Sequence, residues 1–431
     1  MTLQSVRWRF WILTFMAWLP IGFMIPVFVL APLERGLTLG DIGLVLSAYG
    51  LTTVLLELPT GGLADAFGRR PVLIAAALAG AAMALVWYAG TTLLAFVIAA
   101  IIGGISRSLA SGPLEAWFVD TSHDIDPGAP MRKGLAGGTV ADALGLAAGS
   151  LAVTALTFAP GIASDASAFS SWRLAALLAA AAAVVDAIAI AALMREAGGP
   201  RATLRQAIAD VPGVVRRATT IALRPGTIRL LFGAAIMLGL GFATVEMFYQ
   251  PHFRDMLDST EQATRLFGVL GTALSLAAAG GALVAGRIPE GPKFRPARIS
   301  ALALVVTAGA VVGFSLSTTV LVASAFFLAI YVVDGFWYPF SQQILHAGVE
   351  SSERATMVSG WSLSFELGAL VTGLVLAQMA DRTGLDVIFW IAAGALVVAA
   401  VLYVGIDRIS NAPETVSDAE SGATDLPDRR E

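Results

Sequence analysis

The sequence contains no cysteine and little charge, and both absences narrow its possible functions. Without cysteine, disulfides, thiolate nucleophiles and cysteine-based metal sites are excluded. Only 13% of the 431 residues are Asp, Glu, Lys or Arg, whereas soluble proteins carry about 25%. A chain this poor in charge cannot cover a water-facing surface, which indicates a protein whose surface faces lipid.

Recognisable catalytic motifs are missing as well. The three histidines, His123, His252 and His346, lie far apart in the sequence. We find no H-E-x-x-H, no G-x-S-x-G and no G-x-x-x-x-G-K-[ST] motif. The sequence therefore predicts neither an enzyme nor an ATP-driven pump, and it predicts no cofactor, no metal site and no nucleic-acid partner.

What the sequence has in abundance is apolar residues, which make up 57% of the chain. Runs long enough to span a bilayer, about 20 residues, recur along its whole length. The first run is too long for a cleaved signal peptide and is interpreted as a span. We predict an all-α integral membrane protein with twelve transmembrane helices, near residues 10–31, 41–60, 71–89, 92–118, 134–158, 173–194, 228–250, 265–286, 297–315, 319–341, 357–379 and 386–406.

The spans fall into two sets of six that share short sequences. Gly22-Phe23 recurs as Gly241-Phe242, and Gly61-Gly62 recurs as Gly280-Gly281, both at the same separation. We therefore predict two pseudo-symmetric halves, at residues 1–194 and 228–406. A basic linker at 195–227 joins them, and a disordered acidic tail follows at 407–431.

The distribution of Lys and Arg predicts the orientation. Most of them fall in the loops that share a side with the N-terminus, and this excess marks the cytoplasmic face. The opposite face holds only Arg35, Arg173, Arg254, Arg265 and Arg382. Both termini and the linker are therefore expected in the cytoplasm.

A polar stretch between the second and third spans is the strongest motif in the chain. It reads Gly61-Gly62-Leu63-Ala64-Asp65-Ala66-Phe67-Gly68-Arg69-Arg70-Pro71-Val72-Leu73, and we predict a tight cytoplasmic loop. It resembles the signature G-x-L-a-D-r-x-G-R-r-x-v-l of the major facilitator superfamily, although Ala66 stands where that family usually has a basic residue. The resemblance implies two six-helix halves around a central pathway, with gating by Gly61, Leu63, Asp65, Gly68, Arg69 and Arg70.

One acidic residue is a candidate partner of this motif. Asp120 lies at the cytoplasmic end of the fourth span. It either pairs with Arg69 or Arg70, as charge networks do in relatives, or lies in water.

Ionisable side chains inside spans are costly and are functional candidates by default. They are Glu57, Arg107, Glu115, Asp142, Asp186, Glu246, Asp334 and Glu366; Glu57 and Glu115 lie near span ends, where they could reach water. The resemblance places the first, fourth, seventh and tenth helices around the pathway, so Arg107, Glu246 and Asp334 would face it. The full set of predicted pathway residues is Arg107, Asp142, Glu246, Gln250, Asp334, Trp337 and Tyr338.

Several of these residues have a structural alternative. Asp142 and Asp186 could equally be buried partners of other groups, and the aromatic residues could form an interfacial belt. Arg107 and Asp334 lie at matching depths in equivalent spans and could pair across the halves. The alternative is that Arg107 pairs with Glu115 two turns further along its own span. Gly145 and Gly149 in the fifth span are interpreted as sites of helix packing.

Three functions were compared for such a chain. We expect a secondary transporter in the cell membrane, present as a monomer, that exports a lipophilic or cationic small molecule in exchange for protons. Proton-coupled uptake of a sugar or other metabolite is the alternative. A sensor or scaffold without transport activity is the third, and it would not need the intramembrane charges that this chain keeps.

Overall fold

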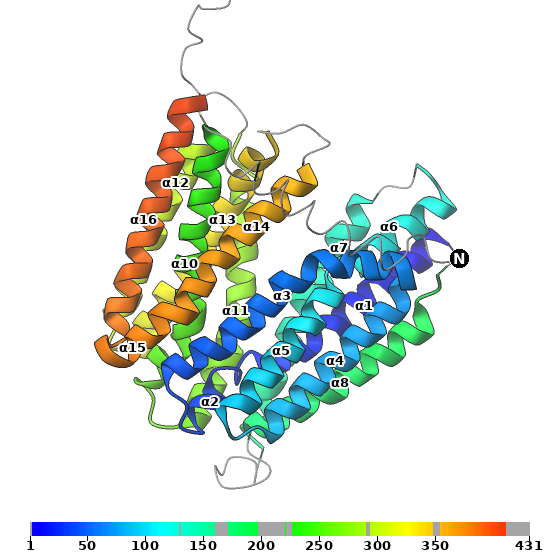
Figure 1. The fold of residues 1–431 in the computed structure, drawn as a ribbon, viewed down its shortest axis with the longest axis horizontal. Helices are drawn as coiled ribbons and strands as arrows, with labels where there is room; N and C mark the ends of the chain where they lie inside the picture. Colours follow the sequence, from blue (N-terminus) through cyan, green and yellow to red (C-terminus); the bar gives the residue numbers. More distant parts are fainter. Residues whose placement is uncertain are drawn as a thin grey trace, which may run out of the picture.

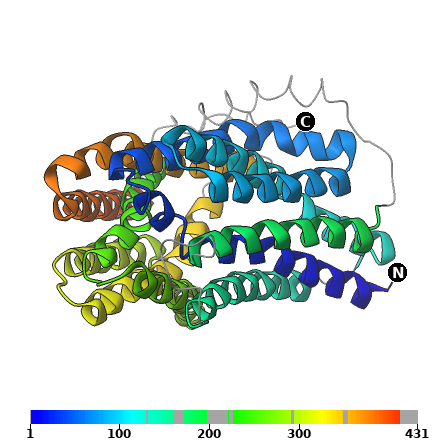
Figure 2. The same cartoon turned by 90° about the horizontal axis from the view of Figure 1, so that it is seen from below.

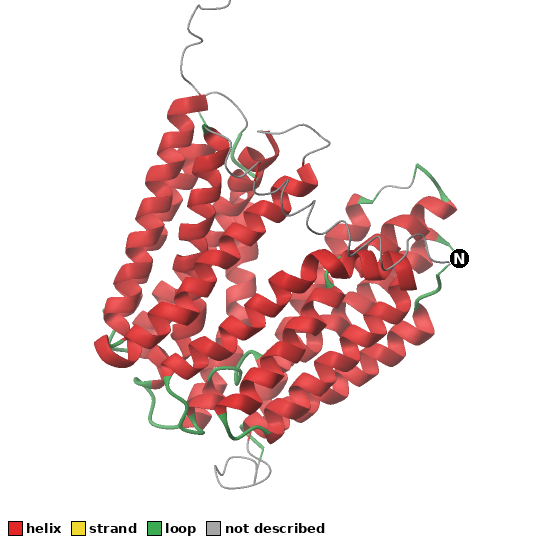
Figure 3. Cartoon of the chain, in the orientation of Figure 1, coloured by secondary structure: helices red, strands yellow, loops and turns green. Residues whose placement is uncertain are grey.

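The computed structural model describes residues 2–128, 131–159, 171–196, 220, 226–289, 294–347 and 354–410. These residues form long helices joined by short connections, and the described part contains no strand (Figure 3). Eleven of its helical segments are long and apolar enough to cross a membrane, and α1 adds a further long helix. The predicted all-α membrane fold is therefore confirmed.

The helices form two groups that lie side by side (Figures 1 and 2). The N-terminal half contains α1 (Leu3–Met24), α2 (Leu30–Leu33), α3 (Leu39–Phe67), α4 (Arg69–Ala89), α5 (Leu93–Ala110), α6 (Pro113–Ile125), α7 (Arg132–Leu156) and α8 (Ser171–Leu193). The C-terminal half contains α10 (Thr227–Arg254), α11 (Thr260–Ala285), α12 (Pro296–Ser315), α13 (Val320–Ala347), α14 (Arg354–Val371), the π-helical η1 (Thr372–Leu376), α15 (Ala377–Thr383) and α16 (Leu385–Ser410).

The main helix contacts repeat from one half to the other. α1 packs on α7 and α8, as α10 packs on α14 and α16. α3 packs on α5, as α11 packs on α13. α4 packs on α5 and α8, as α12 packs on α13 and α16. The two halves are therefore pseudo-symmetric, as the recurring sequences predict.

Small residues allow α1 and α7 to approach closely. A Cβ on Gly149 would lie 2.6 Å from the backbone oxygen of Leu19, and one on Gly145 would lie 2.6 Å from that of Phe15. Membrane helices pack through such close backbone approaches because lipid provides no hydrophobic force between them. The interpretation of these glycines as packing residues is thus confirmed.

Two expected spans are interrupted in the structure. α1 ends at Met24 rather than near residue 31, because Pro26 has no backbone N–H to continue the helix. The expected fourth span at 92–118 is two helices, α5 and α6. Gly112, with φ of +91°, turns the chain before Pro113 begins α6. Glycine is needed there because a side chain disfavours positive φ.

Two segments that we expected outside the helices are partly helical. The polar stretch after the second span is mostly helical, because α3 continues to Phe67 and Gly68 alone separates it from α4. At the end of the chain, α16 continues to Ser410. Asp407, which we expected in the tail, is only 4% exposed and binds Arg298 at 2.7 Å and Arg295 at 3.4 Å. The rest of the tail and most of the linker lie outside the described residues.

The halves meet at the end of the bundle that contains α2 and α15, which we call the closed end (lower part of Figure 1). Gln250 of α10 donates to the backbone oxygen of Ile25 at 2.7 Å, and Arg265 of α11 donates to the side chain and backbone of Thr157 at 2.9 Å. Arg254 pairs with Glu34 at 3.3 Å. Apart from the bond from Thr272 of α11 to the backbone oxygen of Ala147 on α7 at 3.5 Å, the hydrogen bonds found between the described residues of the two halves belong to this end.

The most specific of these contacts joins α15 to the first turn of α3. The carboxylate of Asp381 accepts the backbone N–H groups of Leu39 and Gly40, each at 3.0 Å. The first turn of a helix has N–H groups without helical partners and carries partial positive charge. A carboxylate from one half therefore caps a helix of the other half.

We expect Asp381→Ala to destabilise the contact between the halves. The loss of two charge-assisted bonds at an exposed helix end should cost about 1 kcal/mol, which a thermal unfolding curve of the purified protein in detergent measures. Asp258→Ala is the matched control, because Asp258 is exposed at the same end and its carboxylate makes no contact of this kind in the described structure. Equal unfolding temperatures for the two variants would contradict the role of Asp381.

Candidate functional site

A cavity of about 950 Å³ lies between the two halves. The N-terminal half contributes residues of α1, α3, α4, α5, α6, α7 and α8, and the C-terminal half contributes α10 and α14. Its lining runs from Gln250 at the closed end to Leu114 and Glu115 of α6, near the opposite end. The inner faces of the two halves thus enclose one shared cavity.

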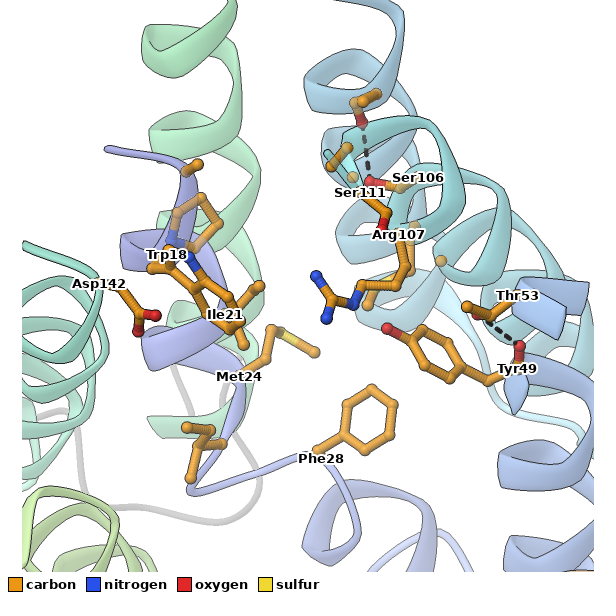
Figure 4. Close-up of a pocket in the computed structure, with 18 of the residues that line it drawn as sticks. Trp18, Ile21, Met24, Phe28, Tyr49, Thr53, Ser106, Arg107, Ser111 and Asp142 are labelled. Carbon is orange, nitrogen blue, oxygen red and sulfur yellow. Dashed lines mark hydrogen bonds between the residues drawn. The ribbon is translucent and has the colours of Figure 1, made fainter. Parts of the chain in front are cut away.

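Among the described residues, Arg107 is the only basic residue in this lining. It lies in the last turn of α5, and its guanidinium points into the cavity from one wall (Figure 4). The ring of Trp18 on α1 lies 5.5 Å from it, a cation–π distance. Tyr49 of α3 and Asp142 of α7 lie within reach of its charge. The described residues provide no carboxylate in direct ion pair with Arg107.

The helix break next to Arg107 explains why this charge can lie at membrane depth. Ser111 and Gly112, which connect α5 to α6, also line the cavity. Non-helical backbone inside a membrane requires a water-filled space or protein partners. The same water can hydrate the guanidinium, so that no permanent partner is needed.

The other charged residues of the lining, as far as the structure describes it, are all acidic. Glu246 of α10 and Glu366 of α14 lie on the C-terminal wall, and Glu246 lies within electrostatic range of both Glu366 and Asp334. The N-terminal half adds Glu115, Asp142 and Asp186. The part of the lining that the structure describes thus contains five carboxylates and one arginine.

The structure brings together four of the seven predicted pathway residues. Arg107, Asp142, Glu246 and Gln250 line the cavity, whereas Asp334, Trp337 and Tyr338 of α13 do not. Trp337 is 2% exposed and stacks on Phe242 inside the C-terminal half, and Tyr338 is 47% exposed. The expectation that the tenth helix lines the pathway therefore does not hold for this cavity.

Neither proposed partner of Arg107 pairs with it here. Among the described residues, no ion pair joins Arg107 to Asp334, so that pairing stays a prediction for another conformation. The alternative partner, Glu115, was expected two turns along one helix. Because Gly112 separates α5 from α6, the two side chains do not share a helix face.

The motif residues form a network within the N-terminal half. Arg69 binds Asp120 of α6 at 2.7 Å, so the structure contains the ion pair that we considered. Arg70 donates to the backbone oxygen of Ala191 on α8. Gly61, Leu63 and Asp65 lie in α3, and the side chain of Asp65 is outside the described structure.

One partner of this network was not predicted. Glu196, directly after α8, accepts the backbone N–H groups of Arg69 at 2.6 Å and Arg70 at 3.3 Å. It thereby caps the first turn of α4. Its position after the last span of the half, on the same face as the basic loop, was the only signal available in the sequence.

Comparisons with known proteins agree with this architecture. The sequence profile of the Major Facilitator Superfamily matches residues 10–349. An uncharacterised MFS-type transporter of Methanocaldococcus jannaschii is 28% identical over 95 residues, which cover 22% of this chain and 25% of the relative. The matched segment thus spans a quarter of that relative's length.

Solved structures share the fold at low sequence identity. The nucleoside transporter NupG matches with a TM-score of 0.71 and 16% identity, over 95% of this chain and 100% of that chain. The D-xylose–proton symporter matches with a TM-score of 0.69 and 15% identity, over 94% and 97% of the two chains. A bacterial homologue of the human lysosomal transporter Spinster, solved in an inward-facing conformation, matches with a TM-score of 0.72 and 14% identity, over 95% and 98%. The protein belongs to the major facilitator superfamily of membrane transporters.

Proposed function

We propose that this protein is a secondary active transporter that exports a lipophilic or cationic small molecule in exchange for protons. The observation that carries the proposal is the charge of the shared cavity, in which the described residues include five carboxylates and one arginine. Alternating closure of the two ends of this chamber would move the molecule across the membrane.

The lining suits an organic cation with an apolar body. Trp18, Phe28, Tyr49 and Phe365 supply aromatic faces, which attract cations as well as apolar groups. Drug-sized ligands occupy cavities of about 300–1,000 Å³, and this cavity falls within that range. The excess of carboxylates would repel an anion and attract a cation.

The same carboxylates provide a means of proton coupling. Glu246 lies close to two further carboxylates, Glu366 and Asp334. Neighbouring acids titrate as a coupled set, because ionisation of one disfavours ionisation of the next. A cationic substrate and a proton would therefore compete for this group of residues, which is the requirement for antiport.

The orientation follows from the charge of the loops. With both termini in the cytoplasm, the closed end faces outward and the cavity is reached from inside. Uptake of a sugar or other metabolite stays the alternative. The similarity to the D-xylose–proton symporter does not decide between export and uptake, because it shows the fold alone. Export predicts that an inwardly directed proton gradient drives the substrate out of the cell.

Single-cysteine labelling tests the orientation without background, because the chain has no cysteine. Lys133→Cys lies at the start of α7, on the same side of the bundle as the motif at 61–73. Asp258→Cys lies at the closed end, between α10 and α11. We expect a membrane-impermeant maleimide added to intact cells to label Asp258→Cys only. Lys133→Cys should react only after the cells are opened, and the reverse pattern would contradict the orientation.

Glu246→Gln tests the coupling. In proteoliposomes with an imposed pH gradient, the rate of tetraphenylphosphonium transport should fall about tenfold. This fall corresponds to an activation free energy that is higher by about 1.4 kcal/mol. Exchange of the cation without a gradient should persist, because glutamine keeps the size and polarity of the side chain. Asp255→Asn, an exposed carboxylate outside the cavity lining, is the control. Unchanged pH-driven transport in Glu246→Gln would remove this residue from the mechanism.

A further inference from the structure

One acidic residue of the cavity is far more buried than its neighbours. Asp186 lies in the middle of α8, is 5% exposed and contributes to the cavity lining. Its Oδ1 atom is buried and has no hydrogen-bond partner among the described residues. Buried polar groups are nearly always hydrogen-bonded, so this unpartnered carboxylate oxygen requires an explanation.

The surroundings of Asp186 offer no fixed cation. α8 packs on α1 and α4, and the described residues that these three helices contribute to the cavity lining include no basic side chain. The nearest bases along these helices are engaged elsewhere. Arg70 of α4 binds Ala191, about 7.5 Å further along α8, and Arg9 of α1 donates to the backbone oxygen of Leu193 at 2.9 Å.

Further charged groups on α8 and on the helices that contact it have partners of their own. Arg173, on α8 itself, lies over Trp172 at the other end of the helix. From the neighbouring α7 and α11, Asp142 lies near Arg107, and Arg265 binds Thr157 and Glu261. Among the described residues, no ion pair reaches Asp186, and its Oδ1 atom has no hydrogen-bond partner.

An isolated carboxylate in such a place must be neutralised or compensated, because removal of its hydration costs several kcal/mol. A metal ion does not fit, since cations such as Ca²⁺ require six to eight oxygen ligands and the described residues contain no group of three acidic or histidine side chains suited to a metal. An organic ammonium group does not fit either, because Oδ1 is buried and only a small part of the carboxylate faces the cavity. A proton delivered by a single cavity water does fit.

We propose that Asp186 is a proton-binding site of the transport cycle, located in the N-terminal half and separate from Glu246 in the C-terminal half. A proton leaves a hydronium ion in the cavity, forms an O–H bond on the Asp186 carboxylate and later returns to water. The two acids line one cavity from opposite halves. Each half thus has its own protonatable group, and this role in transport rests on the proposed function.

Infrared spectroscopy tests proton binding directly, without a substrate. The purified protein in lipid is titrated from acid to alkaline pH, and the spectrum of Asp186→Asn is subtracted from that of the wild type. We expect one protonated-carboxyl band that appears at acid pH and vanishes at alkaline pH. Asp124→Asn, an exposed carboxylate on α6, should give such a band only at the low pH at which exposed carboxylates protonate, below the pH at which the Asp186 band vanishes. A carboxyl band absent at every pH, or one that never titrates, would overturn the proposal.

Transport of tetraphenylphosphonium in proteoliposomes tests the role in coupling. Asp186→Asn should lose pH-driven transport about tenfold and keep gradient-free exchange, whereas Asp186→Glu should restore part of the pH-driven transport. Asn should not unfold the protein, because a neutral amide costs less to bury than a carboxylate. Wild-type coupling in Asp186→Asn would overturn the proposal. If the wild type itself ignores the pH gradient, the proposed function fails, and the infrared result still decides whether Asp186 binds a proton.

Discussion

The contact between the two halves at the closed end is the interaction on which the rest of the structure depends. Close backbone approaches set its geometry: a Cβ on Gly268 of α11 would lie 2.6 Å from the backbone oxygen of Ser150 on α7. On the other side of the interface, η1 and α15 pack along α3. Asp381 then caps α3 from the opposite half. Because these contacts gather at one end, the rest of the interface is free to form a cavity.

The same contacts must be reversible in a transporter. Capping bonds, a partly exposed ion pair between Arg254 and Glu34, and glycine-mediated packing are each individually weak. Individually weak contacts of this kind can be broken one after another as the halves separate. At the other end, Arg69, Asp120 and Glu196 hold α4, α6 and the end of α8 together within one half, so that the N-terminal half can move as a rigid unit.

Much of the fold follows from the sequence, because apolar runs, loop charges and the motif at 61–73 are local signals. The cavity lining was harder to predict. Lipid is as apolar as the protein interior. The sequence of α13 therefore does not show whether the face that bears Asp334 and Trp337 lines the pathway or packs against other helices. The break at Gly112 and the cap by Glu196 depend on tertiary contacts. Asp186 was visible as an intramembrane acid, but its lack of a partner is visible only in three dimensions.

Reversible locking of the closed end tests the central claim most directly. Glu34→Cys and Arg254→Cys place one thiol on each half, where the native side chains lie 3.3 Å apart. After reaction with a short, reducible thiol cross-linker, the double variant should lose transport of tetraphenylphosphonium, and reduction should restore it. Each single variant treated in the same way should remain active. Full transport by the cross-linked double variant would contradict the claim that the halves separate at this end during the cycle.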